Sequence, residues 1–254
     1  MALFKNDQKA KAKPKFVKAA NFVSAMAQNV PFSYSEAYKA LRTNLDFVAK
    51  ASGVKCIVVT SALPEESKST VSINLALTLA DSRKSVVLVE CDLRKPTMRR
   101  YLKLERGLSG LSAVLAGTVT LDEAMQYVEE SNIHVLTAGT IPPNPAELLD
   151  QERMSKLIGE LKERFDYVIL DAPPITVVTD AAVVGRMADG ALLVVRSRFA
   201  PTRTVRLALQ RLQAVNIKVL GAVLTRFDTQ KAGWRTGYSY TSYEYGYRQP
   251  RSDK

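Results

Sequence analysis

The sequence is poor in the residues that build metal sites and disulfide frameworks. Among 254 residues it has two cysteines, Cys56 and Cys91, and one histidine, His134. Both cysteines lie in apolar runs and do not form a C-x-x-C pair, so neither a disulfide framework nor a zinc site is expected. We expect both to be reduced thiols of the core. His134 lies inside an apolar run and is expected to pack in or beside a strand.

Long apolar stretches are also missing. No run approaches the roughly 18 apolar residues of a membrane-spanning helix. The N-terminus is basic but lacks the apolar stretch and the small-residue cleavage site of a signal peptide. Hydrophobic residues make up 46% and charged residues 24% of the chain, which excludes a disordered or fibrous protein. We expect a folded protein that stays in the cytoplasm unless a partner holds it at the inner face of a membrane.

The net charge of +11 is concentrated at the two ends. Residues 1–18 contain six lysines and one aspartate, and residues 226–254 contain six basic and three acidic residues. Such ends can contact nucleic acid or an anionic membrane, or they can be flexible and simply solvated. No aromatic residue lies between Lys5 and Lys15, which argues against nucleic acid as a partner.

Strand-length and helix-period segments alternate through the middle of the chain. Runs rich in Val, Ile and Leu predict strands that are covered on both faces, at 56–60, 85–91, 133–137, 167–170, 191–196 and 217–225. Helical periodicity occurs at 34–51, 69–82, 151–165, 179–189 and 202–215. This alternation predicts a three-layer α/β domain with a predominantly parallel sheet flanked by helices. We assign a basic flexible segment to residues 1–30, the domain to 31–228 and a tail without apolar periodicity to 229–254.

A candidate phosphate-binding loop follows the first of these strands. The sequence TSALPEESKST occupies residues 60–70 and leads directly into a helix. In such loops backbone N–H groups and the helix N-terminus bind phosphate oxygens. Lys68 would reach the β- and γ-phosphates, and the Ser69 hydroxyl would bind Mg²⁺. A plain helix N-cap would explain the Ser and Thr residues equally well, but the position after a buried strand favours the nucleotide interpretation.

Three acidic residues stand at the carboxyl ends of two predicted strands. Glu90 and Asp92 end the run at 85–91, and Asp171 ends the run at 167–170. Ligands of open parallel sheets bind outside these ends. A single aspartate there is usually a helix cap, whereas three that converge are suited to Mg²⁺ binding and general-base chemistry.

With these residues in view, the chain resembles the bacterial tyrosine kinases, the cytosolic ATPases of capsular and exopolysaccharide assembly systems. The resemblance spans nearly the whole length and includes EAYKALRTNL (36–45), SALPEESKST (61–70), VLVECDLRKP (87–96), GTIPPNPAELL (139–149), YVILDAPP (167–174), VTDAAVVGRMADGALLVVR (178–196) and the tyrosine-rich C-terminus. It implies a P-loop NTPase fold and ATP-dependent phosphorylation of protein tyrosines. It also implies an activating membrane polysaccharide co-polymerase as partner and a homo-oligomeric ring.

The resemblance also assigns roles to individual residues. The nucleotide would be bound by Pro64, Glu65, Glu66, Ser67, Lys68, Ser69 and Thr70. Mg²⁺ would be held by Ser69, Asp92 and Asp171, and catalysis would involve Lys68, Glu90, Asp92 and Asp171. Autophosphorylation would fall on Tyr238, Tyr240, Tyr243, Tyr245 and Tyr247. Glu36, Lys39 and Arg42 share one broad helix face and would mediate contacts between subunits.

Three departures from the family pattern leave a second function open. Glu65 and Ser67 replace glycines, and Glu90 replaces an aspartate. If the backbone at Ser67 is left-handed, the replacement costs about 1 kcal/mol. Glu65 adds negative charge near the phosphates, and Glu90 moves its carboxylate one methylene outward. The alternative is therefore an ATP-binding pseudokinase or regulatory scaffold of a polysaccharide co-polymerase. A DNA-partition ATPase is disfavoured, because those proteins carry a lysine where Leu63 stands here.

Overall fold

The computed structural model describes residues 15–17, 30–104 and 109–227. Within them, the strands form one eight-stranded sheet in the order β1-β4-β5-β3-β6-β2-β7-β8. All neighbouring pairs are parallel except β4 and β5, which are antiparallel. The strands are β1 (Lys15–Val17), β2 (Cys56–Ser61), β3 (Val86–Glu90), β4 (Gln126–Val128), β5 (Ile133–Leu136), β6 (Tyr167–Asp171), β7 (Gly190–Arg196) and β8 (Val219–Thr225).

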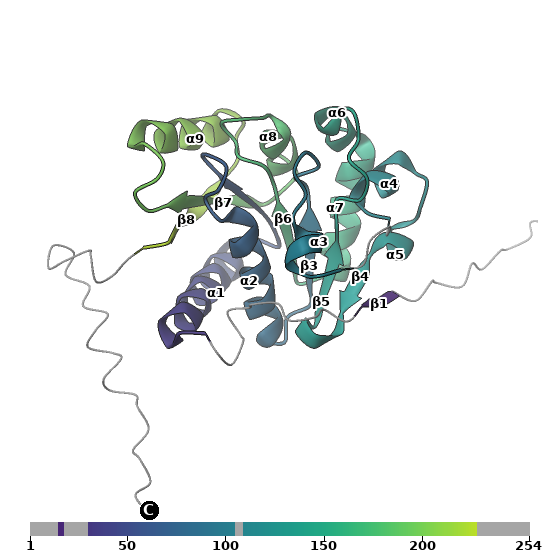
Figure 1. Ribbon diagram of the computed structural model, residues 1–254, viewed down its shortest axis with the longest axis horizontal. Helices are drawn as coiled ribbons and strands as arrows, with labels where there is room; N and C mark the ends of the chain where they lie inside the picture. Colours follow the sequence, from purple (N-terminus) through teal and green to yellow (C-terminus); the bar gives the residue numbers. More distant parts are fainter. Residues whose placement is uncertain (1–14, 18–29, 105–108, 228–254) are drawn as a thin grey trace, which may run out of the picture.

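Helices cover both faces of this sheet (Figure 1). One face carries α1 (Phe32–Ser52), α2 (Lys68–Asp81) and α3 (Met98–Tyr101). The other carries α4 (Leu111–Ala116), α5 (Leu121–Ala124), α6 (Pro145–Leu149), α7 (Glu152–Arg164), α8 (Asp180–Gly185) and α9 (Thr202–Ala214). A short 3₁₀ helix, η1 (Glu129–Ser131), joins β4 to β5.

The core consists of two apolar layers, one on each side of the sheet. Along β2, Cys56 and Val58 pack into one layer, whereas Ile57 and Val59 pack into the other. Since successive side chains of a strand point to opposite faces, a strand buried on both faces must be apolar throughout. This requirement explains the apolar runs of β2, β3, β5, β6 and β7. Strand β8 lies at the edge of the sheet and its residues are only half-buried or exposed, so the prediction that it is covered on both faces was wrong. All six predicted strands are present, and the three-layer fold is confirmed.

The five predicted helices are present, but shorter elements were missed. The helix predicted at 179–189 ends at Gly185, and β1, β4, η1, α3, α4, α5 and α6 were not predicted. Each missed element has six residues or fewer, too few to establish a period. Helix α2 is buried along most of its length because α1 packs over it, and its buried residues include the polar Ser72, Asn74 and Thr78.

Some predictions lie outside the described residues. These are the flexible character of residues 1–14 and 18–29, the tail at 229–254 and all five of its tyrosines. Within the segment predicted to be flexible, residues 15–17 are described and form β1, which pairs with β4, so for these three residues the prediction was wrong. Among the helices that the structure describes, none combines the length and hydropathy that crossing a membrane requires.

The sheet order places three strand ends side by side. Strands β3, β6 and β2 are consecutive neighbours in the sheet. Their parallel direction brings Glu90, Asp171 and the loop after Ser61 to the same carboxyl edge. The helix that follows this loop, α2, starts at Lys68.

Candidate active site

The loop between β2 and α2 has a left-handed backbone at the two positions where the family has glycine. Glu65 has φ 65° and Ser67 has φ 70°, both in the left-handed region that favours glycine. Each such residue costs roughly 1 kcal/mol relative to glycine. The exposed side chain of Glu65 lies at the outer surface of the loop, where solvent weakens its repulsion of an anion.

The start of α2 is arranged to receive an anion. Ser67 occupies the N-cap position but its side chain makes no capping hydrogen bond to the helix. The first N–H groups of a helix have no partner within the helix, and they carry the positive end of its dipole. The loop therefore supplies backbone donors where a phosphate-binding site needs them.

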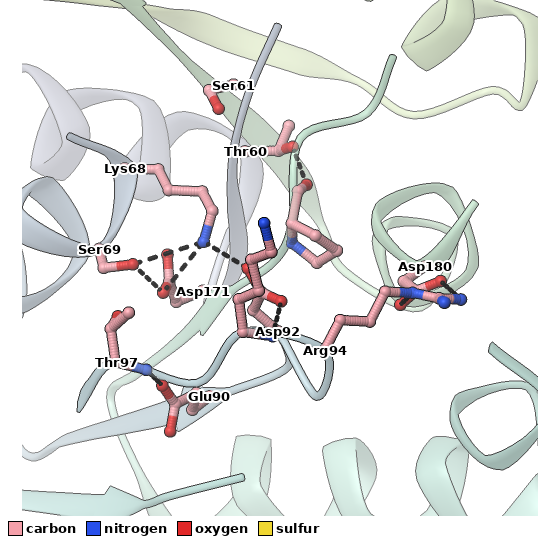
Figure 2. A network of polar contacts seen from close by, with 12 residues as sticks. Thr60, Ser61, Lys68, Ser69, Glu90, Asp92, Arg94, Thr97, Asp171 and Asp180 are labelled. Carbon is pink, nitrogen blue, oxygen red and sulfur yellow. Dashed lines mark hydrogen bonds and ion pairs between the residues drawn. The ribbon is translucent and has the colours of Figure 1, made fainter. Parts of the chain in front are cut away.

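Lys68 is the centre of a compact polar cluster (Figure 2). Its Nζ lies 3.0 Å from Oδ2 of Asp92 and 3.6 Å from Oδ2 of Asp171, and its side chain is 13% exposed. Burial disfavours the charged form of Lys68, but the carboxylates of Asp171 and Asp92 outweigh burial and raise its pKa. The lysine is therefore charged at neutral pH and can exchange its carboxylate partners for phosphate oxygens.

Asp171 is held from two positions of α2. The Ser69 hydroxyl donates to Oδ2 at 2.6 Å, and the Ser72 hydroxyl donates to Oδ1 at 3.0 Å. The side chain of Asp171 is fully buried, and burial raises its pKa although Lys68 and the two hydroxyls oppose the shift. Ser72 was missed from the sequence, but its spacing of three residues from Ser69 would have placed it on the same helix face.

Glu90 departs from the expected convergence of three acids. One carboxylate oxygen accepts the N–H groups of Thr97 and Met98 at 2.5 and 2.8 Å, and the other accepts the N–H of Ala138 at 3.0 Å. Figure 2 shows Glu90 pointing toward Thr97 and away from the Lys68 cluster. Burial raises the pKa of Glu90, while the backbone donors lower it. The extra methylene thus carries the carboxylate into a pocket of backbone donors.

A second ion pair, in which Asp180 is buried and Arg94 is exposed, borders the cluster and was not predicted. Arg94 follows Asp92 and donates twice to the carboxylate of Asp180, with N–O distances of 2.9 and 3.0 Å. Asp180 is fully buried at the start of α8, so the bidentate pair fixes the loop after β3. The Lys95 N–H also donates to Asp92 at 3.0 Å, which holds that carboxylate toward Lys68. No spacing rule in the sequence pairs residues 94 and 180.

The donor set fits a nucleotide with its magnesium ion. Among the described residues no group of three or more Asp, Glu, His or Cys side chains could hold a metal by itself. Mg²⁺ commonly binds through one or two protein oxygens together with substrate phosphates and water. Ser69, Asp92 and Asp171 offer such oxygens beside Lys68 and the N-terminus of α2.

The predicted interface residues of α1 do not form one free face. Lys39 contacts Glu36 at 2.7 Å, and both side chains are 39% exposed. Arg42 instead donates to the carbonyl oxygen of Thr78 on α2 at 3.1 Å and lies 3.8 Å from Asp81. Arg42 therefore helps to fix α1 on α2, whereas the other two remain accessible.

The histidine and the cysteines take the core roles that were predicted. His134 is part of β5 and packs between the rings of Tyr127 and Phe165, and burial lowers its pKa. Cys56 and Cys91 are free and buried, and burial raises the pKa of Cys56 to about 12. A thiol with so high a pKa is unreactive at neutral pH.

Comparison with known proteins agrees with this geometry. Residues 54–220 match the family described as the AAA domain. The tyrosine-protein kinase YwqD of Bacillus subtilis is 39% identical over 206 residues, which cover 81% of this chain and 85% of the kinase. The chain belongs to the bacterial tyrosine-kinase family. The tyrosine-protein kinase Etk of Escherichia coli is 34% identical over 94% of this chain, but the match covers only 31% of Etk. The chain thus spans most of one relative and about a third of the other.

Solved structures of this family superpose on the fold. The chimeric protein CapA2B2 gives a TM-score of 0.76 at 32% identity, with 85% of this chain and 96% of that chain covered. The kinase domain of Escherichia coli Etk gives 0.73 at 35% identity, with 84% and 86% covered. The septum site-determining protein MinD of Pyrococcus horikoshii is 22% identical with a TM-score of 0.59, over 67% and 69% of the chains, and shares the P-loop ATPase fold.

Proposed function

We propose that the protein is an ATP-dependent protein-tyrosine kinase that phosphorylates the tyrosine-rich tail of a neighbouring copy. The observation that carries the proposal is the position of Lys68. Its charged amine stands at the start of α2, within 3.0 Å of Asp92 and 3.6 Å of Asp171. A mostly buried lysine at the end of a phosphate loop, whose amine faces two acids at strand ends and the Ser69 hydroxyl, is poised to bind the β- and γ-phosphates.

The residues of the cluster divide the work of phosphoryl transfer. Lys68 binds the transferred phosphoryl group, and the N–H groups at the start of α2 bind its neighbours. Bound Mg²⁺ would neutralise phosphate charge, and Ser69 and Asp171 are the side chains that would hold it. Ser72, which donates to Asp171, would keep this carboxylate in place when the ion is bound.

Asp92 is the proposed general base. A phenol ionises near pH 10, so its oxygen needs a base to attack at neutral pH. In the transfer the phenol oxygen forms a bond to the γ-phosphorus, the bond from that phosphorus to the leaving ADP oxygen breaks, and the phenol proton passes to Asp92. Glu90 was the other candidate, but both of its oxygens accept backbone N–H groups. We therefore propose that Glu90 fixes the loop at Thr97.

The tail supplies the substrate in this proposal. The basic C-terminal segment contains five tyrosines in the ten-residue stretch 238–247, at 238, 240, 243, 245 and 247. Each phosphate adds about −1.5 to −2 charge, so modification reverses the sign of the tail. We propose that this reversal switches the assembly between ring and monomer and so regulates capsular or exopolysaccharide synthesis through a membrane co-polymerase. Glu36, Lys39 and Arg42 are the proposed contacts of the ring.

Incubation with Mg-ATP and a candidate co-polymerase activator tests the proposal. We expect mass spectrometry to find phosphate on Tyr238, Tyr240, Tyr243, Tyr245 or Tyr247 in the parent protein. None is expected in a folded Lys68→Met variant, which lacks the cation beside Asp92 and Asp171. Phosphate that is confined to other residues would contradict the tail as substrate.

The alternative function is a regulatory scaffold that binds ATP without useful transfer. It is favoured by the two left-handed non-glycine residues in the loop, Glu65 and Ser67. If the parent binds Mg-ATP but no phosphotyrosine forms, even in the Glu65→Gly/Ser67→Gly variant, the scaffold is the better description.

A further inference from the structure

A buried glutamate lies between the two left-handed residues of the phosphate loop. Glu66 is completely buried, whereas its neighbour Glu65 is exposed. One carboxylate oxygen of Glu66 accepts the N–H of Leu63 at 2.6 Å, and the other accepts the N–H of Arg196 at 3.1 Å. The side chain thus joins the start of the loop to the end of β7.

The main chain of the same residue is tied to the next strand. The hydroxyl of Thr225, at the end of β8, donates to the carbonyl oxygen of Glu66 at 3.0 Å. On the other side, the Arg196 guanidinium donates to the carbonyl oxygen of Glu65 at 3.4 Å. The loop is therefore held against the ends of β7 and β8 in the segment where residues 65 and 67 are left-handed.

These contacts oppose the preference of the two flanking residues. A non-glycine residue relaxes readily out of the left-handed region unless its surroundings determine its conformation. Hydrogen bonds from N–H groups to an ionised carboxylate are roughly twice as strong as neutral ones. A buried carboxylate that lost them would remain desolvated and unpaired, so the contacts are hard to give up.

We infer that Glu66 is a positioning residue that holds the phosphate loop in its binding-competent shape without touching the nucleotide. The inference rests on the proposed function, because it takes Mg-ATP as the ligand of the loop. Glu66 holds residues 65 and 67 in the left-handed conformation that glycines would adopt without strain. The hydroxyl of Thr225 holds the carbonyl group of Glu66 as a second attachment.

A pair of matched substitutions separates shape from charge. Glu66→Gln and Glu65→Gln remove the same charge one residue apart. We expect calorimetry to show that Glu66→Gln weakens Mg-ATP binding on the order of tenfold, because an amide cannot accept both N–H groups. Glu65→Gln should strengthen binding, since it removes negative charge near the phosphates. If both variants strengthen binding, Glu66 acts only through its charge and the inference is overturned.

The same substitution in a glycine background tests the coupling to backbone strain. In the Glu65→Gly/Ser67→Gly variant, where both positions tolerate positive φ, we expect Glu66→Gln to weaken binding by less than about threefold. An equal loss in both backgrounds would overturn the inference, because the effect of Glu66 would then be independent of the strained residues. A contribution of Glu66 to global stability alone would not produce this difference.

Amide hydrogen exchange without nucleotide gives an independent readout. Glu66→Gln should speed the exchange of the Leu63 and Arg196 N–H groups, whereas Glu65→Gln should not; unchanged exchange in Glu66→Gln overturns the inference. If Glu66→Gln fails to fold, Thr225→Val takes its place, and about threefold weaker Mg-ATP binding is expected; unchanged binding overturns the inference. A parent protein that binds no Mg-ATP would overturn the proposed function and the inference together. A parent that binds it, with the pair of glutamine variants behaving alike, overturns the inference alone.

Discussion

The carboxyl edge of the sheet and the outer face of α1 both carry patterned charges, but the two regions treat them differently. At the edge, Lys68, Asp92 and Asp171 come from three separate elements and are nearly or fully buried. On α1, Glu36 and Lys39 are three residues apart and remain 39% exposed. Burying charges is costly, whereas an exposed pair on one helix forms at little cost and contributes little. The energetic cost of the buried cluster therefore requires an explanation, and ligand binding provides one. The exposed pair on α1 requires no such explanation.

The carboxylates at the edge fall into two groups of their own. Asp92 and Asp171 accept from side chains that a ligand can displace or join, namely Lys68, Ser69 and Ser72, although Asp92 also accepts the N–H of Lys95. Glu66 and Glu90 accept only from backbone N–H groups. Contacts of the first kind can be exchanged for phosphate or Mg²⁺. Contacts of the second kind fix the path of the chain around the site.

Among the substitutions that test this difference between the two groups of carboxylates, we expect Glu90→Asp to have the largest effect on stability. In Glu90→Asp the carboxylate retreats by one methylene and cannot reach the N–H groups of Thr97, Met98 and Ala138 together. We expect the free energy of unfolding in urea to fall by about 2–4 kcal/mol. The exposed Glu160, which pairs with Arg164 four residues on, is the matched control. Glu160→Asp should change the free energy of unfolding by about 0.5 kcal/mol or less.

Equal stability of the two variants would contradict the structural role of Glu90. Glu90→Asp would in that case be a harmless return to the family residue. Its effect on phosphoryl transfer could then be attributed to the position of a base.

Charge reversal on α1 tests the other region and is expected to have a smaller energetic effect. Glu36→Lys combined with Arg42→Glu should leave monomers in light scattering, because it opposes charges at the proposed subunit contact. The pair Glu160→Lys and Arg164→Glu reverses a comparable helical pair on α7 and should leave the mass unchanged. An unchanged mass in the α1 variant would mean that Glu36 and Lys39 are an ordinary solvated pair and that Arg42 serves only to bind Thr78.

The sequence was most informative where a pattern depends on neighbours along the chain. The six predicted strands followed from runs of Val, Ile and Leu, and for all of them except the edge strand β8 double-sided burial accounts for these runs. The resemblance raised a left-handed backbone only as a condition at Ser67, and the structure has it at both Ser67 and Glu65. The positions of Lys68, Ser69, Asp92 and Asp171 beside one another followed from strand ends that share an edge.

The sequence was least informative where a side chain binds a distant backbone group. The fate of Glu90 depends on Ala138, 48 residues away, and that of Glu66 on Arg196, 130 residues away. Backbone N–H groups carry no residue-specific signal, so no motif predicts which of them a buried carboxylate will meet. The pairing of Arg94 with Asp180 escaped prediction for the same reason, since only the packing of α8 against the loop after β3 brings them together.

Titration of Mg-ATP into the parent protein and into Lys68→Met by calorimetry tests the central claim most directly. Lys68 is the cation on which Asp92 and Asp171 converge, so its loss removes the charge that would bind the β- and γ-phosphates. We expect one site per chain in the parent protein. A folded Lys68→Met variant, verified by circular dichroism, should bind at least about a hundredfold more weakly. Equal affinity in the two proteins would contradict the assignment of the cluster as the nucleotide site.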